Sequence, residues 1–283
     1  MEYPIRLKEF KNWCLNPERE TLVMGILNVT PDSFSDGGKF LDVDKAVKHA
    51  ESMIRDGADI IDVGGESTRP GATEVSLDEE LQRVIPVIKK IRVANPGALI
   101  SIDTTKGTVA KHAIDAGADI INDISGISKD PKISKIARAY KVPIIIMHIK
   151  GTPRSMQLKP NYKNLIQEIK DYFIERTNIA INQGIAKEDI ILDPGIGFGR
   201  TVQNNFELIA NLDEFCKLDF PIMIGPSRKS FIGTILDLPI NERMEGTCAS
   251  VTAGIMNGAR IVRVHDVKSM KRIVIITEKI RTA

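Results

Sequence analysis

The sequence DGADII at residues 56–61 returns as AGADII at residues 116–121 and, more loosely, as NGARIV at residues 257–262. In each copy a helical pattern stops at a glycine, and a short apolar run begins directly after it. Glycine readily adopts the left-handed conformation that ends many helices. The repeat therefore predicts a helix-to-strand junction that occurs several times along the chain, at the end of the fold away from the functional site.

Outward from this repeat, short apolar runs rich in β-branched residues alternate with longer segments of helical periodicity. Such runs are typical of strands buried on both faces. The expected strands are 22–29, 59–63, 99–102, 119–124, 143–148, 189–192, 221–224 and 260–264, and the clearest helices are 44–55, 77–93, 163–183 and 241–256. Eight strand–helix units close a (β/α)₈ barrel, although an open doubly wound sheet also fits the alternation. We predict an α/β protein: a single TIM barrel over residues 21–283, with an N-terminal extension over residues 1–20.

Composition excludes several classes of protein. The chain has 283 residues, with 39 Lys and Arg against 37 Asp and Glu. This balance argues against a protein that binds nucleic acid or a membrane surface, but it does not exclude one that binds a small anion. The three cysteines form no C-x-x-C pair, so neither a disulfide framework nor a thiolate zinc site is expected. Residues 1–20 lack the apolar core of a signal peptide, and no apolar run is long enough to span a membrane. We expect a cytoplasmic protein.

Polar residues follow nearly every expected strand. They are Asn28, residues 64–71, Asp103, Asn122, His148, Asp193, Lys229, Arg263 and His265. A single polar strand end is also expected wherever a strand meets water. Eight successive polar strand ends are harder to attribute to contact with solvent. The C-terminal strand ends of a barrel converge on one mouth, where active sites are built.

The residue types at this mouth fall into two groups. Acceptors and an amide, suited to the donor-rich edge of a planar heterocycle, come from Asp103, Asn122 and Asp193. Positive charge, suited to a phosphate or diphosphate, comes from Arg69, Lys229, Arg263 and His265. We therefore expect a polar heterocycle joined to an anion. We also expect segregated charges, with the carboxylates facing the heterocycle and the cations facing the diphosphate.

Two loops rich in small residues, 30–38 and 67–71, have the composition of segments that close over a substrate. The glycines of GIGFG at residues 195–199 lack the G-x-G-x-x-G spacing of a dinucleotide site, and GPSRKS at residues 225–230 lacks the spacing of a Walker A loop. Neither a G-x-S-x-G elbow nor an H-E-x-x-H motif is present. The motifs that remain suit ligand binding rather than a protein nucleophile.

Several of these motifs together resemble those of the dihydropteroate synthase family. NVTPDSFSDGG at residues 28–38 resembles the first family signature, and DVGGESTRPG at residues 62–71 resembles the second. Residues 193–199, 225–230 and 263–267 match further blocks in the right order. The resemblance extends over about residues 22–270. Departures are modest: Arg200 stands where the family often has Lys, and Asn204 where it often has His.

The resemblance implies a barrel that condenses 6-hydroxymethyl-7,8-dihydropterin diphosphate with p-aminobenzoate, giving dihydropteroate and diphosphate for folate synthesis. It also implies Mg²⁺ as cofactor, sensitivity to sulfonamides and a homodimer formed through the last helices. Substrate binding is implied for Thr68, Asp103, Asn122, Met147, Asp193, Phe198, Gly225, Lys229, Arg263 and His265. The p-aminobenzoate pocket is implied for Phe34, Pro70 and Ser227, the metal for Asn28, and catalytic roles for Asp36, Arg69, Asp103 and Lys229.

Two other functions share parts of this pattern. A corrinoid-dependent methyltransferase has the barrel and the pterin pocket but lacks the 28–38 loop and the 227–229 block, both of which are present here. A non-catalytic pterin-binding paralogue would not need Asp36, Arg69, Lys229 and Arg263 together. The length leaves no room for a fused pterin pyrophosphokinase, so we expect a monofunctional enzyme.

Overall fold

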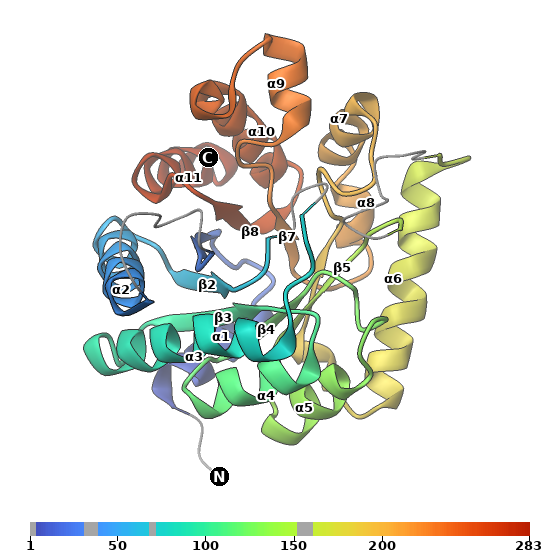
Figure 1. The fold of residues 1–283 in the computed structure, drawn as a ribbon. Helices are drawn as coiled ribbons and strands as arrows, with labels where there is room; N and C mark the ends of the chain where they lie inside the picture. The colour runs from blue at the N-terminus through green and yellow to red at the C-terminus, as the bar shows by residue number, and fades with distance from the viewer. Residues whose placement is uncertain (1–3, 31–38, 68–71, 152–160) are drawn as a thin grey trace.

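The computed structural model describes residues 4–30, 39–67, 72–151 and 161–283. Eight parallel strands hydrogen-bond in chain order and close into a barrel, β1-β2-β3-β4-β5-β6-β7-β8 (Figure 1). They are β1 (Leu22–Asn28), β2 (Ile60–Gly64), β3 (Leu99–Asp103), β4 (Ile120–Asp123), β5 (Ile144–Met147), β6 (Ile190–Asp193), β7 (Ile222–Ile224) and β8 (Ala259–Val264). The predicted TIM barrel is confirmed, and the open sheet is excluded.

Helices surround this barrel and bury its outer face (Figure 1). In the described chain they are α1 (Ile5–Leu15), α2 (Lys39–Arg55), α3 (Leu77–Ala94), α4 (Gly107–Asp115), α5 (Lys132–Tyr140), α6 (Leu165–Asn182), α7 (Val202–Ala210), α8 (Asp213–Cys216), α9 (Ser230–Leu236), α10 (Met244–Met256) and α11 (Val267–Arg281). Two short 3₁₀ turns, Lys187–Asp189 and Ile240–Glu242, precede β6 and α10. None of the helices in the described ranges is long and apolar enough to cross a bilayer.

Inside the barrel, side chains form an apolar layer below a polar one. The apolar layer is a cluster of buried residues, one from most strands: Met24, Ile60, Ile120, Ile145, Ile191, Met223 and Ile261. Side chains of a strand alternate between its two faces, so the residue two positions later points inward again. Those positions hold the polar residues Asp62, Asn122, Asp193 and Arg263, together with Ile26, Met147 and Gly225. The inward-facing polar residues therefore lie at the C-terminal ends of the strands.

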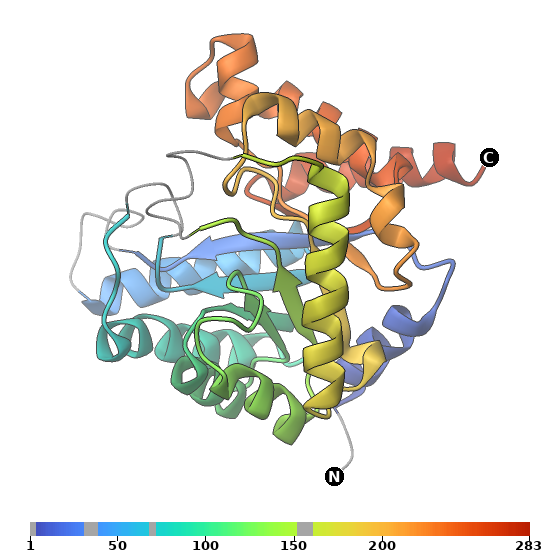
Figure 2. The same ribbon diagram turned by 90° about the vertical axis from the view of Figure 1, so that its right-hand side faces the viewer.

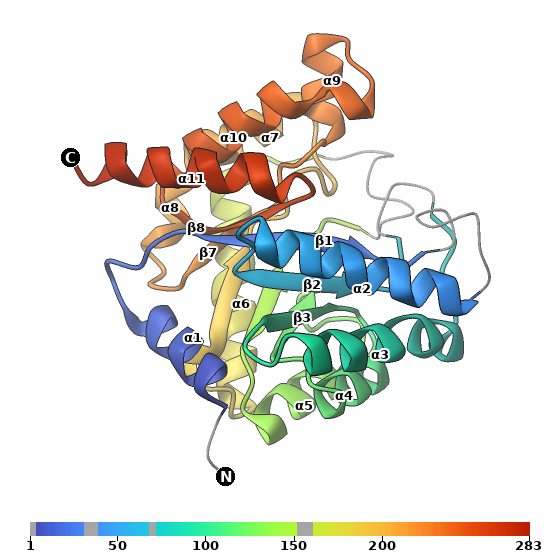
Figure 3. The same cartoon turned by 90° about the vertical axis from the view of Figure 1, so that its left-hand side faces the viewer.

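The N-terminal segment closes the opposite end of the barrel. Helix α1 lies away from the strand arrowheads in both side views (Figures 2 and 3). Phe10 is buried with the apolar layer and stacks on Trp13, with 5.4 Å between ring centroids. The Lys11 Nζ atom lies 2.6 Å from a carboxylate oxygen of Asp189, just before β6. Within the extension expected over residues 1–20, helix α1 thus packs against the barrel and forms its floor.

Phe10→Ala tests how much the packing of α1 against the barrel contributes to stability. Phe10 is 2% exposed, so truncation leaves a cavity against the barrel's apolar layer. Buried Phe-to-Ala changes cost about 3–5 kcal/mol. We expect the free energy of unfolding, measured in urea, to fall by about 3 kcal/mol, with substrate KM values unchanged at a temperature where the variant is folded. A loss below about 1 kcal/mol would mean that α1 is dispensable for the barrel.

The repeat at residues 56–61, 116–121 and 257–262 lies at the helix-to-strand junctions that it predicts. The glycine of each copy has a positive φ: 99° at Gly57, 111° at Gly117 and 108° at Gly258. The aspartates of the first two copies have equivalent contacts. Asp59 Oδ2 accepts a hydrogen bond from the Val23 N–H at 2.8 Å, and Asp119 Oδ2 accepts one from the Ile100 N–H at 3.1 Å. Each carboxylate therefore satisfies an amide near the start of the preceding strand.

Candidate functional site

Strand register brings the predicted polar residues to one rim of the barrel. Asn28 at the end of β1 lies beside Gly64, Gly64 lies beside Asp103, and Asp103 lies beside Asn122. On the other side, Met147 and Asp193 are paired at the ends of β5 and β6. These residues come from separate parts of the chain, and barrel closure makes them neighbours.

The centre of this rim is a hydrogen-bonded ionic network around Arg263. Arg263 Nε lies 2.6 Å from Asp62 Oδ2, and Arg263 Nη2 lies 2.8 Å from Asp103 Oδ2. Asn122 Nδ2 donates to the same Asp62 oxygen at 3.1 Å. The expected segregation of charge is therefore wrong for Arg263, because its guanidinium binds the carboxylates instead of standing apart from them. These hydrogen bonds hold the donors and acceptors of the network in fixed orientations.

This network leaves two polar atoms without partners in the described chain. They are the buried oxygens Asn122 Oδ1 and Asp62 Oδ1. A buried acceptor without a donor is costly, so such atoms mark positions where a bound molecule can donate. Burial and the nearby Asp62 carboxylate raise the pKa of Asp103 to about 7, while Arg263 opposes the shift. Burial thus favours the neutral acid of Asp103, and the ion pair with Arg263 favours its carboxylate.

Asp193 is a second buried acceptor, at the end of β6. It is 5% exposed, and its Oδ1 accepts a hydrogen bond from the Gly195 N–H at 2.8 Å. Within the described ranges, no residue donates to Oδ2. Burial raises the Asp193 pKa to about 6, and the Gly195 N–H and Lys229 reduce the shift. At pH 7 the residue therefore presents a carboxylate edge that can accept hydrogen bonds from a ligand.

An apolar wall stands beside these acceptors. Ile124, Met147 and Phe198 form a separate buried cluster at the mouth. Lys229 Nζ lies 4.1 Å from the centroid of the Phe198 ring, a cation–π contact. Burial, followed by the charge of Arg263, lowers the pKa of Lys229 to about 8, so the amine is mostly charged at pH 7. A flat aromatic ligand could lie on this wall while the amine contacts its anionic end.

Ser227 and His265 face each other across the ends of β7 and β8. Ser227 Oγ lies 3.0 Å from His265 Nδ1 and accepts a hydrogen bond from the His265 N–H at 3.2 Å. Burial and the charge of Arg263 lower the pKa of His265 to about 4. The neutral imidazole is therefore favoured here at pH 7, and it can donate or accept a hydrogen bond. The positive charge expected of His265 beside a diphosphate stays a prediction.

Some predicted residues lie elsewhere. His148 does not face the centre of the mouth: its Nδ1 is 2.8 Å from Arg200 Nη2, and its ring contacts Tyr172 edge-on, with 4.7 Å between centroids. Gly225, by contrast, follows β7 on the inward face, two positions after Met223, as expected for a site residue. Five expected side chains lie outside the described residues: Phe34, Asp36, Thr68, Arg69 and Pro70.

Asp62 is a site residue that the sequence does not predict, although it begins the DVGGESTRPG motif at residues 62–71. The signal for Asp62 is an aspartate inside an apolar run, two positions after the inward-facing Ile60. Nor does the sequence predict Glu80, a buried carboxylate of α3 whose Oε1 accepts a hydrogen bond from Thr104 Oγ1 at 2.6 Å. Lys106 binds Glu80 and Glu66, so these ion pairs hold the segment after β2. Only tertiary structure brings Glu66, Glu80 and Lys106 together.

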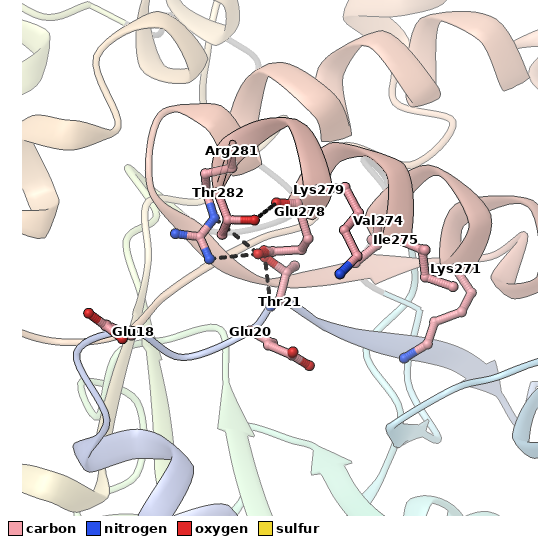
Figure 4. A pocket seen from close by; sticks show the side chains of 10 residues that line it. All are labelled: Glu18, Glu20, Thr21, Lys271, Val274, Ile275, Glu278, Lys279, Arg281 and Thr282. Carbon is pink, nitrogen blue, oxygen red and sulfur yellow. Dashed lines mark hydrogen bonds and ion pairs between the residues drawn. The ribbon is translucent and has the colours of Figure 1, made fainter.

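A separate hollow of about 580 Å³ lies between the segment before β1 and helix α11 (Figure 4). Thr21, at the N-terminal end of β1, hydrogen-bonds Glu278, and Arg281 pairs with the same carboxylate. The hollow is lined by Glu18, Glu20, Thr21, Lys271, Val274, Ile275, Glu278, Lys279, Arg281 and Thr282. None of these residues is among the predicted site residues, and the hollow lies at the other end of the strands.

The chain is similar to known proteins in both sequence and fold. The family model described as "Pterin binding enzyme" matches residues 24–265. Dihydropteroate synthase of Synechocystis is 51% identical over 256 residues, 90% of this chain and 88% of the relative. The Yersinia pestis enzyme, solved with a sulfonamide drug complex, is 42% identical with a TM-score of 0.88, covering 93% of this chain and 95% of that one. The Xanthomonas albilineans enzyme, solved with 4-aminobenzoic acid, is 37% identical with a TM-score of 0.88, covering 94% and 95%.

Proposed function

The chain belongs to the dihydropteroate synthase family of pterin-binding enzymes, and from that premise we propose which of its residues perform each part of the reaction. The enzyme condenses 6-hydroxymethyl-7,8-dihydropterin diphosphate with p-aminobenzoate, giving dihydropteroate and diphosphate for folate synthesis. The observation that carries the residue assignment is the set of buried acceptors beside a cationic amine at one barrel mouth.

The pterin binds deepest, on the acceptors. A pterin edge carries an amino group and a ring N–H side by side, and a carboxylate can accept both hydrogen bonds in parallel. Asp193 supplies that carboxylate, and Asn122 Oδ1 accepts a further hydrogen bond. Met147 and Phe198 cover a face of the ring. This orientation directs the pterin methylene and its diphosphate toward Lys229.

The reaction needs no protein nucleophile. The bond between the methylene carbon and the diphosphate oxygen breaks, and its electron pair leaves with the diphosphate. The methylene cation that develops is delocalised into the ring and stabilised by Asp103. The amine of p-aminobenzoate donates its electron pair to the carbon and then loses a proton. Cations that neutralise the departing charge accelerate such a step. We assign this role to Lys229 and to Arg69 of the 67–71 loop. We also assign a catalytic role to Asp36 of the 30–38 loop.

The second substrate binds at the outer edge of the mouth. We place p-aminobenzoate between Ser227, Pro70 and Phe34. His265, bonded to Ser227 at 3.0 Å, and Thr68 are placed near the diphosphate. We assign Gly225, at the inward face of β7, to substrate binding; a Cβ added there would meet Arg263 Cβ at 3.8 Å, an ordinary contact. The amine of p-aminobenzoate then faces the pterin methylene.

The donor set fits Mg²⁺ held mainly by substrate. Mg²⁺ is usually bound by one or two protein oxygens together with phosphates and water. Across the described ranges, no cluster of three or more His, Cys, Asp or Glu residues could hold a metal. Asn28 offers one amide oxygen at the rim, beside Gly64. We assign Asn28 to Mg²⁺, which when bound neutralises charge on the diphosphate.

Asn28→Ala tests that assignment. Removing one protein oxygen weakens the metal but leaves the pterin acceptors intact, so we expect the Mg²⁺ concentration at half-maximal activity to rise at least tenfold. Activity at saturating Mg²⁺ should recover to within about fivefold of the wild type. Titration of diphosphate release against MgCl₂ measures both quantities. An unchanged Mg²⁺ requirement removes Asn28 from the metal site.

Diphosphate release on mixing both substrates separates the candidate functions. The proposed enzyme releases diphosphate only when p-aminobenzoate is present and forms one dihydropteroate for each diphosphate. A non-catalytic paralogue would bind the pterin without release, and a methyltransferase would need a corrinoid partner. No release above background from folded protein with Mg²⁺ would falsify the assignment.

We further propose a homodimer in the cytoplasm. Isoleucines on α11 support the assembly, because Ile276 and Ile280 lie one turn apart and are 61% and 59% exposed. Exposed apolar side chains that share a helix face are typical of protein interfaces. Sedimentation of the purified chain measures the assembly, and a monomer at micromolar concentration would contradict it.

A further inference from the structure

The turn after β6 is unusually dependent on glycine. Gly195, Gly197 and Gly199 have φ values of 75°, 84° and 63°. Glycine loses more conformational entropy on ordering than any other residue, so a turn built this way has little intrinsic preference for one shape. Yet this turn supplies the N–H that binds Asp193 and carries Phe198 of the apolar wall. Something outside the turn must fix its shape.

The Arg200 side chain spans the two ends of this turn. It is 4% exposed. Its Nη2 donates to the Pro194 carbonyl at 2.7 Å, and its Nη1 donates to the Phe198 carbonyl at 2.9 Å. One rigid guanidinium therefore fixes the separation of carbonyls on either side of Gly195 and Gly197.

Arg200 also ties the turn to the neighbouring strand and helix. Its Nη2 lies 2.8 Å from His148 Nδ1, directly after β5. An arginine can only donate, so His148 accepts, and burial with the charge of Arg200 lowers the His148 pKa to about 3. The Tyr162 hydroxyl, ahead of α6, contacts Arg200 Nη1, and its ring lies 5.0 Å from the guanidinium carbon. These contacts tie the turn to the end of β5 and to the segment that precedes α6.

The centre of the turn has its own contact. Asn205 of α7 is 3% exposed, and its Oδ1 accepts a hydrogen bond from the Gly197 N–H at 2.6 Å. Asn205 Nδ2 donates to the Thr201 carbonyl at 2.8 Å, which fixes the direction of the amide. Asn205 thus holds the middle of the turn while Arg200 holds its ends.

The charge environment of Arg200 indicates positioning rather than ion pairing. In the described parts of the chain, no carboxylate lies within salt-bridge distance of its guanidinium, and its partners are carbonyls, a hydroxyl and a neutral imidazole. A buried cation compensated only by dipoles is poorly suited to stabilising a fold. Its planar fork of donors is suited to fixing several acceptors in one geometry.

We propose that Arg200 is a positioning residue for pterin recognition, setting the 194–199 turn so that Asp193 and Phe198 meet the ring in a fixed geometry. The inference rests on the proposed function, since it assigns Asp193 and Phe198 to the pterin. It makes Arg200 a determinant of pterin affinity without contact to either substrate.

Arg200→Met tests this with Arg92→Met as matched control. Arg92 is also a largely buried arginine that binds carbonyls, with Nη2 2.8 Å from the Gly117 oxygen, but it lies at the other end of the barrel. In Arg200→Met we expect the KM for the pterin diphosphate and the Kd for a pterin, measured by calorimetry, to rise at least tenfold. The KM for p-aminobenzoate, measured at saturating pterin, should stay within threefold. Arg200→Lys should recover part of the loss.

Hydrogen exchange supplies a readout that does not depend on activity. Amides of residues 195–199 should exchange at least tenfold faster in Arg200→Met and at the wild-type rate in Arg92→Met. Unchanged exchange and unchanged pterin affinity in folded Arg200→Met would overturn the proposal, as would equal rises in both KM values. A wild-type protein without diphosphate release would instead refute the proposed function, and the exchange result would still report on Arg200.

Discussion

Asp193→Asn is expected to abolish pterin binding while making the folded chain more stable. The substitution keeps the size and the acceptor for the Gly195 N–H, which lies 2.8 Å from Oδ1. It replaces the second carboxylate oxygen, which we assign to the pterin, by an amide that donates. A donor then faces the donor-rich edge of the ring. Mismatches of this kind reduce binding by roughly 10⁴-fold when the polar groups are buried. We therefore expect calorimetry to detect no heat of pterin binding.

The gain in stability follows from the pKa of the same group. Burial raises the Asp193 pKa to about 6, above its value in the unfolded chain. The stabilising contribution of this shift is present below about pH 4 and is lost as the pH rises through 6. Near pH 7 the buried charge thus costs the fold about 3 kcal/mol. The substituted asparagine carries no charge, so the variant avoids this cost at neutral pH and matches the wild type near pH 4.

Urea unfolding at pH 4.5 and pH 8 measures that difference. We expect the variant to exceed the wild type by about 1–3 kcal/mol at pH 8 and by much less at pH 4.5. Loss of binding together with a gain in stability excludes misfolding as the cause. A variant that binds the pterin with wild-type affinity removes Asp193 from the recognition of the ring.

The fold could be predicted from the sequence because its signals are local. Residues 56–61 place a glycine and an apolar run in direct succession, and the same order returns at 116–121. Strand boundaries differ by a residue or so for tertiary reasons, whereas α2 begins at Lys39 rather than at 44 and α10 at Met244 rather than at 241. The expected strand 119–124 is observed as Ile120–Asp123, since the Asp119 carboxylate turns toward the N–H of Ile100, and Ile124 joins the apolar wall of the mouth.

The site could be predicted only in part, because its chemistry depends on long-range contacts. Closing the barrel converts polar strand ends into one rim, as expected for Asp103 and Asn122. No local signal indicates that Arg263 would bind Asp62, 201 positions away. Nor does the sequence indicate that burial leaves His265 neutral. Residue types fix what a side chain can do, and the neighbours supplied by the fold decide which of those roles it has.

Lys229→Ala is expected to reduce kcat/KM at least 10³-fold, about 4 kcal/mol in the barrier. Lys229 is the cation beside the apolar wall, 4.1 Å above the Phe198 ring, and we assign it to the departing diphosphate. Truncation of the side chain to a methyl group removes both the positive charge and the contact with the Phe198 ring. Lys271→Ala is the matched control, because that lysine pairs with Asp59 at the other end of the barrel and should leave activity unchanged.

The pH profile distinguishes the charge of Lys229 from its packing. Burial lowers the Lys229 pKa to about 8, so the charged form is present below that pH and is lost as the pH rises through it. We expect wild-type kcat/KM to fall above pH 8, as the free enzyme loses its cation. Lys229→Arg keeps a positive charge throughout this range. Its activity, although reduced by the larger side chain against Gly197, should stay level to pH 10. An alkaline decline that persists unchanged in Lys229→Arg would assign the titration to another group and leave Lys229 with a packing role.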